Sequence, residues 1–238
     1  MKDSTHKKNT DSLVVDRSEI KYMIGMLGYE TLHRLLESTI RKDSYMKSDD
    51  GYLIRSLYFD SVSDKDYFDK LHGLENRKKI RLRIYDFDSD ICKLEIKNRF
   101  NNYNLKESII IDRSAAEQLI DKKFEVLKDL DSPYAQKAYE IMKCQLYAPK
   151  VIVEYDREAY TIPEYDIRIT FDKNVRGSFS HDLYYKNHAM TPLCEPQTMI
   201  LEVKFNNFLP TFLQDILSVC SGSMLSVSKY CLARDTFQ

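Results

Sequence analysis

Charged side chains occupy alternate positions in five segments of this sequence, and most of the positions between them are apolar or aromatic. The segments are RSEIKY at 17–22, KIRLRI at 79–84, KLEIK at 93–97, IRITFD at 167–172 and LEVKF at 201–205. In a β-strand, side chains two residues apart project from the same face, about 7 Å from each other. Each segment therefore predicts a strand with one charged face and one apolar face.

Two arrangements produce this alternation. In the first, an antiparallel sheet packs its apolar face on a core and leaves its charged face in water, which is the simpler explanation for any single strand. In the second, the strands close into a barrel with helices packed outside, so that the charged faces line an interior. Two features of the set favour the barrel: arginine is frequent where a water-facing surface would use lysine, and the charged faces mix bases with acids.

A charged interior of this kind predicts a site for a polyanion. The planar guanidinium group matches phosphate oxygens with two parallel hydrogen bonds. Basic side chains crowded in an interior repel one another unless negative charge balances them. Part of that balance comes from Glu19, Glu95, Asp172 and Glu202, whose hard oxygen atoms suit Mg²⁺ or Mn²⁺. A triphosphate with its metal would supply the rest.

The composition excludes several other classes of protein. The 238 residues include 36 Lys and Arg against 37 Asp and Glu, a net charge of −1, which argues against a basic nucleic-acid coat. The six glycines form neither of the two common nucleotide-phosphate loops, GxGxxG and GxxxxGK[ST]. The five cysteines include no CxxC pair, as expected for reduced thiols in the cytoplasm. No segment approaches the roughly 20 apolar residues of a membrane span, so we expect a soluble, cytoplasmic protein.

The periodicity predicts an α+β chain with eight strands and five helices. The expected strands are 17–22, 52–60, 79–87, 91–98, 105–112, 150–157, 166–172 and 199–205. The expected helices are 29–41, 63–74, 115–128, 134–146 and 210–220. We expect residues 1–12, which are polar and charged, to be a disordered tail, and 13–238 to form a single domain because no linker divides them.

In their order along the chain, these segments resemble the VTC domain. This is the polyphosphate polymerase domain of the vacuolar transporter chaperone family, here in its short bacterial form. The resemblance covers about residues 17–235 and rests on RxExKY at 17–22, SLYFD at 56–60, KIRLRxY at 79–85, LExK at 94–97, YxR at 155–157, RxTxD at 168–172, LExK at 201–204 and SKY at 228–230. Together, KIRLR, LEVK and SKY make the resemblance specific, although each alone is a weak signal.

The resemblance implies a triphosphate tunnel fold, an antiparallel β-barrel of about eight strands with helices outside and a phosphate chain and a divalent metal, Mn²⁺ or Mg²⁺, inside. It implies that Lys21, Arg81, Arg83, Lys97, Lys106, Arg157, Arg168 and Lys204 bind phosphate, and that Lys229 contributes from a C-terminal helix near the tunnel mouth. Among these positions Arg81, Arg83 and Lys21, together with Glu202, are the expected catalytic residues. Glu202 is the main expected metal ligand, with Glu19 and Glu95 as weaker candidates.

The activity implied is transfer of the γ-phosphoryl group of ATP to a growing polyphosphate chain. Such a transfer requires positioning and charge neutralisation more than a covalent nucleophile. The related CYTH enzymes begin with ExExK, whereas Arg17 stands at the first of these positions here, which favours a polymerase. Two alternatives stay open: a hydrolase of inorganic or nucleoside triphosphates on the same fold, and a non-catalytic module that binds polyphosphate or inositol phosphates. Glu202 argues against the module, because a pure polyanion receptor has little use for an interior carboxylate.

The partners implied are ATP and inorganic polyphosphate, and no nucleic acid is expected. Members of this family commonly handle polyphosphate together with a membrane protein. A separate membrane subunit is therefore an expectation that follows from the resemblance alone.

Overall fold

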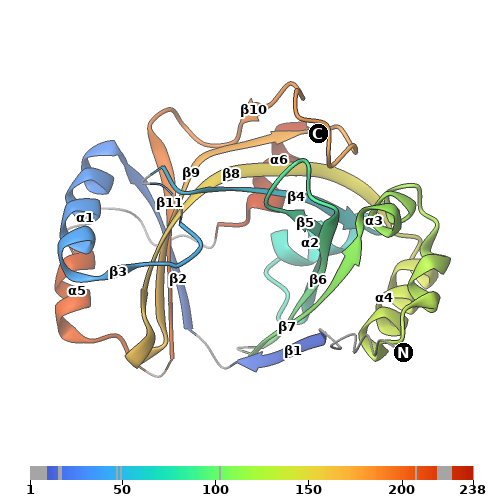
Figure 1. Ribbon diagram of the computed structural model, residues 1–238, viewed down its shortest axis with the longest axis horizontal. Coiled ribbons are helices and arrows are strands. Elements are labelled where there is room, and N and C mark those ends of the chain that lie inside the picture. Colours follow the sequence, from blue (N-terminus) through green and yellow to red (C-terminus); the bar gives the residue numbers. More distant parts are fainter. Residues whose placement is uncertain are drawn as a thin grey trace, which may run out of the picture. The chain divides into compact units, whose positions relative to one another are not determined.

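The alternating segments form antiparallel strands, and helices pack beside them (Figure 1). The computed structural model describes residues 10–15, 18–46, 48, 50–101, 103–206, 208–218 and 227–237. They belong to two compact units. The first comprises the residues up to Val15, Tyr58–Ile84 and Asp88–Pro149, and the second comprises Asp16–Leu57, Tyr85–Phe87 and Lys150–Gln238. Strand β4 (Tyr52–Asp60) contributes residues to both.

In the first unit, four antiparallel strands follow the order β1 (Thr10–Val15), β7 (Tyr103–Asp112), β6 (Ile91–Phe100) and β5 (Arg77–Ile84). Their register places Arg81 opposite Glu95, and Glu95 opposite Ser108, so these residues share one face. The apolar residues between them, such as Leu94, are buried. This alternation puts Arg81, Glu95 and Lys106 on a common face of β5, β6 and β7, whereas Lys78 and Glu107 lie on the opposite face.

Helices of the first unit are α2 (Lys65–Leu71), α3 (Arg113–Ile120) and α4 (Pro133–Cys144), with a 3₁₀ helix at Phe124–Asp129. Helices α3 and α4 pack against β6 and β7. The hydroxyl of Tyr134 on α4 donates a hydrogen bond of 3.1 Å to the carbonyl of Leu94 on β6. The helices thus lie beside the strands whose apolar residues are buried, as the sequence predicts.

In the second unit, the antiparallel order is β8 (Ala148–Ile162), β9 (Ile167–Ser178), β11 (Thr198–Phe205) and β2 (Ser18–Gly25). Two short strands join it, β3 (Arg41–Lys42) beside β8 and β10 (Thr191–Pro192) beside β9. The helices are α1 (Met26–Thr39), α5 (Thr211–Ser218) and α6 (Lys229–Phe237). Helices α1 and α5 lie together and bury Leu36 and Leu213 against Leu201 of the sheet (Figure 1).

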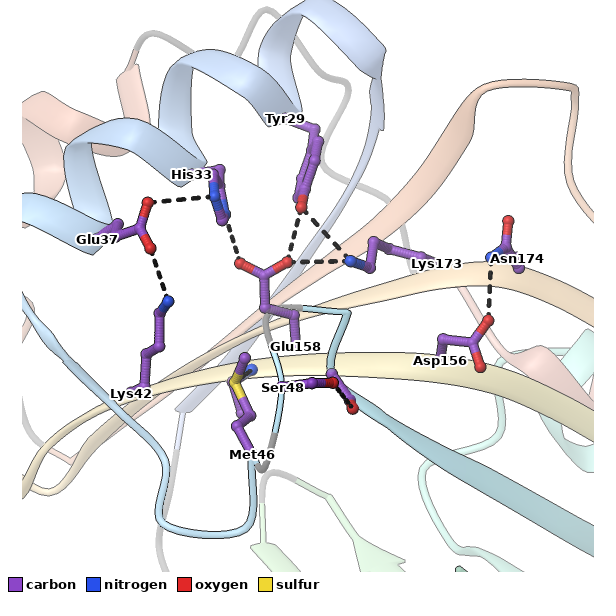
Figure 2. Close-up of polar contacts among 12 residues, drawn as sticks. Tyr29, His33, Glu37, Lys42, Met46, Ser48, Asp156, Glu158, Lys173 and Asn174 are labelled. Atoms are coloured by element: carbon purple, nitrogen blue, oxygen red, sulfur yellow. Dashed lines mark hydrogen bonds and ion pairs between the residues drawn. The ribbon is translucent and has the colours of Figure 1, made fainter.

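A buried carboxylate ties α1 to the sheet of the second unit (Figure 2). Glu158 of β8 is fully buried and accepts hydrogen bonds from the hydroxyls of Tyr29 and Tyr160 at 2.7 and 2.6 Å. Lys173 Nζ lies 3.2 Å and His33 Nδ1 2.6 Å from the same carboxylate. Burial alone would raise the pKa of Glu158, but these partners outweigh it and hold the pKa below its ordinary value. Glu158 is therefore an ionised link between α1, β8 and β9.

All eight predicted strands are confirmed, and the structure extends several of them. Strand β5 ends at Ile84 instead of residue 87, while β8 and β9 run several residues further than their alternating segments. The described part of the chain contains eleven strands instead of about eight, because β1, β3 and β10 carry too little alternation to be recognised. Strand β1 begins at Thr10, inside the expected tail, and residues 1–9 lie outside the described residues.

The predicted helix over 115–128 is divided in the structure. Helix α3 ends at Ile120, and Lys122 adopts a left-handed backbone with φ of +64°, which an α-helix cannot continue through. The helix also begins at Arg113, two residues earlier than expected. Asp112 caps it by accepting a 2.7 Å hydrogen bond from the backbone amide of Ala115.

Candidate polyanion-binding site

Glu95 is the centre of a basic cluster in the first unit, formed with Arg81, Arg83 and Lys106. Arg81 Nε lies 2.7 Å from one carboxylate oxygen, Arg83 Nη1 lies 3.8 Å from the same oxygen, and Lys106 Nζ lies 2.5 Å from the other. The carboxylate is 1% exposed. Burial would raise the pKa of Glu95, but the three cations lower it far below its ordinary value. The Glu95 cluster therefore holds three positive charges around one negative charge.

Other residues extend this cluster. The Tyr58 hydroxyl accepts a 2.9 Å hydrogen bond from Arg81 Nη1, which fixes the guanidinium group. Lys97 lies directly between Lys79 and Lys106 in the strand register, so three ammonium groups share one row. Burial and then the neighbouring arginines lower the pKa of Lys106, while Glu95 raises it, and the net shift is downward. This face carries more positive charge than its one carboxylate neutralises.

Glu202 is the centre of a second cluster, in the second unit, with Glu19, Lys21 and Lys204. Lys21 lies opposite Glu202 in the register of β2 and β11, and its Nζ lies 3.4 Å from the Glu202 carboxylate and 2.7 Å from Glu19. Lys204 Nζ lies 2.6 Å from the other Glu202 oxygen. Burial would lower the pKa of Lys21, yet Glu202 and Glu19 raise it above its ordinary value. Burial would raise the pKa of Glu202, but Lys204 and Lys21 lower it well below its ordinary value, so this carboxylate and the Lys21 amine are both charged near neutral pH.

Asp172 joins two further predicted phosphate-binding residues in the same unit. Arg157 donates Nε and Nη2 to the two Asp172 oxygens at 2.6 and 2.8 Å, and Lys229 Nζ of α6 lies 2.5 Å from Oδ2. Both cations lie over the Tyr155 ring, 5.2 and 4.8 Å from its centroid. Burial would raise the pKa of Asp172, but Arg157 and Lys229 lower it to about 2. The same two cations also lower the pKa of Glu202, so these groups act on one another electrostatically.

Arg168 takes a different set of partners from the other predicted site residues of this unit. It lies opposite Lys204 in the register of β9 and β11. Its Nη2 lies 2.7 Å from the Asp43 carboxylate and donates to the Tyr52 hydroxyl at 2.9 Å. The segment after β3, which carries Asp43, therefore orients Arg168.

Glu202 and its neighbours have the donor chemistry that a divalent cation requires. Among the described residues, no group of three or more His, Cys, Asp or Glu side chains gathers as a complete protein ligand set. Mg²⁺ commonly takes one or two protein carboxylates and completes its coordination with phosphate oxygens and water. Directly opposite Glu202 lies Thr170, whose buried Oγ1 has no hydrogen-bond partner. A buried unpaired hydroxyl is costly, which favours a polar ligand at this position.

Glu95, like Glu202, has basic groups at both of its oxygens. Three cations, two of them guanidinium groups, surround the Glu95 carboxylate, which favours a charge-balancing role for this residue. Its assignment as a metal ligand stays a prediction, as does that of Glu19. Arg17, which the comparison with ExExK uses, lies outside the described residues.

These basic faces of antiparallel strands, with helices on the apolar side, define a triphosphate tunnel type of fold. A candidate adenylate cyclase from Bacillus halodurans has a TM-score of 0.50 to this chain at 14% identity, covering 90% of this chain and 96% of that one. HpAC1 from Hippeastrum, a candidate adenylyl cyclase described with a dominant triphosphatase activity, has a TM-score of 0.54 at 14% identity over 92% and 96% of the chains. At such identities these likenesses concern the fold alone.

The chain belongs to the VTC domain family, whose sequence model matches residues 16–238. A comparison with curated proteins found no match. In the described part of the chain, none of the helices has the length and apolar character needed to cross a membrane.

Sequence reasoning left two residues out of the predicted site. Asp172 was expected to balance charge with an oxygen donor suited to Mg²⁺ or Mn²⁺ but was not assigned to the site, and in the structure it is fully buried and holds both Arg157 and Lys229. Its position two residues from Thr170 on the charged face was the available signal. Asp43 had no such signal, because it lies in a loop without periodicity and reaches Arg168 only in the folded chain.

Proposed function

We propose that this protein is a polyphosphate polymerase that transfers the γ-phosphoryl group of ATP to the end of an inorganic polyphosphate chain. The observation that supports the proposal most is that two buried carboxylates, Glu95 and Glu202, each lie within ion-pair distance of two or more cations on their own strand face. A site of this kind is preorganised for multiple phosphate groups, because the basic side chains are already fixed and charged. Membership of the VTC family supports the same substrate class.

The chain's own residues have separable roles in this reaction. Arg81 and Arg83 neutralise negative charge that develops on the transferred phosphoryl group, and Lys21 orients the phosphate that accepts it. Lys97, Lys106, Arg157, Arg168, Lys204 and Lys229 bind the remaining phosphates. The attacking oxygen belongs to a terminal phosphate, which is ionised at neutral pH, so the protein does not need a general base.

Glu202 is the proposed protein ligand for the divalent cation, Mn²⁺ or Mg²⁺. When bound, such a cation neutralises phosphate oxygens and fixes their geometry. Thr170 would donate its hydroxyl hydrogen to a phosphate oxygen beside Glu202. Asp172 would keep Arg157 and Lys229 in position.

A triphosphatase is the second candidate function. The fold likeness to HpAC1, described with a dominant triphosphatase activity, favours it. On this scaffold a hydrolase differs only in allowing water, instead of a phosphate chain, to reach the γ-phosphorus. As further expectations from the family, we propose a cytoplasmic location and a separate membrane subunit.

Incubation with ATP and Mn²⁺, followed by gel separation of the products, tests the proposal. A polymerase yields polyphosphate chains that lengthen with time, together with ADP. Free phosphate in place of chains would establish the triphosphatase instead. ATP that binds but stays intact, with either Mn²⁺ or Mg²⁺, would reduce the protein to a polyanion-binding module.

A further inference from the structure

The basic face of the first unit continues beyond the Glu95 cluster, toward the start of β5 at Arg77. Two further rows follow in the strand register. The first places Lys79, Lys97 and Lys106 side by side, and the second places Arg77 opposite Arg99. Like charges directly across a sheet repel one another, so a polyanion lying along these two rows would stabilise them. From Arg83 to Arg77 the basic face extends over seven residues, which is six steps along the strand or about 20 Å.

A pocket of about 350 Å³ lies at the far end of this face. Its lining consists of Gly73, Glu75, Arg77, Arg99 and Asn101. Arg77 Nη1 donates to the Leu74 carbonyl and Arg99 Nε donates to the Asn101 carbonyl, both at 2.8 Å. These bonds to the adjoining turns fix the planes of both guanidinium groups at the pocket.

We propose that this pocket, which we call the Arg77–Arg99 pocket, binds the distal phosphates of a linear polyphosphate longer than three units. The inference rests on the proposed function and makes it more specific. The basic face has four rows, at Arg83, Arg81, Lys79 and Arg77, and neighbouring rows are about 7 Å apart. A triphosphate contains only two P–O–P linkages and is too short to cover all four rows. A longer chain places a phosphate at each row. Arginine suits the last row because its planar donor group matches phosphate oxygens.

Glu75 allows a second test of the proposal, in which the expected change in affinity has the opposite sign. It is exposed and lines the same pocket as the two arginines. A carboxylate at that position repels an incoming phosphate. It therefore limits the affinity of the pocket, and removing its charge should tighten binding where removing an arginine weakens it.

The test compares two ligands, tripolyphosphate and a long-chain polyphosphate, by calorimetric titration at one fixed salt concentration. The proteins are the full chain and its Arg77→Gln, Arg99→Gln and Glu75→Gln variants. Each arginine variant should weaken long-chain binding by about tenfold, the effect of one charge-assisted hydrogen bond, and change tripolyphosphate binding less than about twofold. Glu75→Gln should tighten long-chain binding. Arg113→Gln, which breaks an exposed ion pair with Glu117 on α3, is the control and should change neither affinity.

Equal losses for both ligands would overturn the proposal, because Arg77 and Arg99 would then belong to the triphosphate-binding cluster. Unchanged long-chain affinity in both arginine variants would also overturn it. If single-stranded RNA of similar charge bound the pocket as tightly as polyphosphate, the occupant would be nucleic acid. The titration measures binding and does not require turnover. If the protein bound long chains through these arginines but made no polyphosphate, the proposed pocket would be supported and the polymerase function refuted.

Discussion

Arg157 and Asp172 face each other across β8 and β9 and form an ion pair on the face of the sheet that carries the proposed site. The next residue on each strand, Glu158 and Lys173, forms a second ion pair on the opposite face, with Nζ 3.2 Å from the carboxylate. The Arg157–Asp172 pair orients a cation of the proposed site, and the Glu158–Lys173 pair anchors α1. A one-residue slip between the strands would break both pairs at once, so the two ion pairs fix the register that the site requires.

Arg157→Lys should lower turnover by about tenfold or more while changing the melting temperature little. Lysine keeps the positive charge but replaces the two-pronged contact with Asp172 by a single one. Asp172 keeps Lys229 as a partner, so no buried charge is left unpaired. Steady-state polymerisation and thermal unfolding, measured on the same preparations, separate the two effects. Wild-type turnover in this variant would show that the geometry of Arg157 does not matter to the reaction.

Glu202→Gln should abolish turnover at saturating Mn²⁺ while the protein stays folded. The substitution preserves shape but removes the ionised oxygens that the proposed cation needs. Circular dichroism checks the fold, and product gels check activity. Glu19→Gln is the matched comparison, because Glu19 contacts the same Lys21 amine and is only a secondary ligand candidate. A Glu202→Gln protein as active as wild type would refute the assignment of Glu202 as the ligand of the divalent cation.

The period of the strands made much of this site predictable. A pleated strand sends alternate residues to opposite faces whatever the rest of the chain does, so Arg81, Arg83 and Glu95 could be assigned to one face from local sequence. The ion-pair partners could not be assigned in this way. The pairing of Arg157 with Asp172 depends on how β8 and β9 align, and an irregularity between Glu154 and Asp156 shifts that register.

Residues far apart along the chain were the least predictable. Lys229 reaches Asp172 because α6, whose sequence shows weak amphipathic periodicity, packs against β9. Asp43 reaches Arg168 from a loop. Such contacts arise from long-range packing, which strand periodicity does not encode.

Glu95→Gln should destabilise the ligand-free protein and increase its stabilisation by tripolyphosphate. Without the carboxylate, the buried Arg83 and the partly buried Arg81 repel each other and the more exposed Lys106 amine. A bound polyanion relieves that repulsion, and a ligand at a hundred times its dissociation constant stabilises a fold by about 2.7 kcal/mol. Thermal shifts with tripolyphosphate and with AMP, at low and high salt, provide the measurement. AMP should act weakly on both proteins, and equal tripolyphosphate shifts in both would mean that Glu95 does not balance these cations.

Glu158→Gln should lower the free energy of unfolding by about 3 kcal/mol, because it leaves the Lys173 amine with a neutral partner in a buried network. Lys42→Gln is the control within the same region (Figure 2). It breaks the exposed Lys42–Glu37 pair and should change stability by less than about 0.5 kcal/mol. Urea denaturation of the three proteins compares them, and similar losses in both variants would contradict the anchoring role of Glu158.

Asp66→Asn should remove a pH dependence of stability that opposes the one from Glu158. Asp66 is fully buried in the first unit, with Lys78 Nζ 3.1 Å away and a 2.7 Å hydrogen bond from the Tyr147 hydroxyl. Burial raises its pKa from 3.8 to about 6, although Lys78 and Tyr147 act in the other direction. Between these two values the folded protein keeps a proton that the unfolded chain has lost, so this group makes stability fall as pH rises through the window.

The fall amounts to about 3 kcal/mol, at 1.36 kcal/mol per pKa unit. Glu158, whose pKa is lowered, contributes with the opposite sign, because its stabilisation is lost as pH falls. Asparagine at position 66 cannot titrate, so the Asp66→Asn protein should gain on wild type by up to that amount between about pH 4 and pH 7. Lys78→Met removes the nearest cation and should raise the pKa of Asp66 in the folded protein further, so that stability continues to fall up to a higher pH. Urea unfolding of the three proteins across this range provides the test, and parallel curves for wild type and Asp66→Asn would show that Asp66 has the same pKa in the folded and unfolded states.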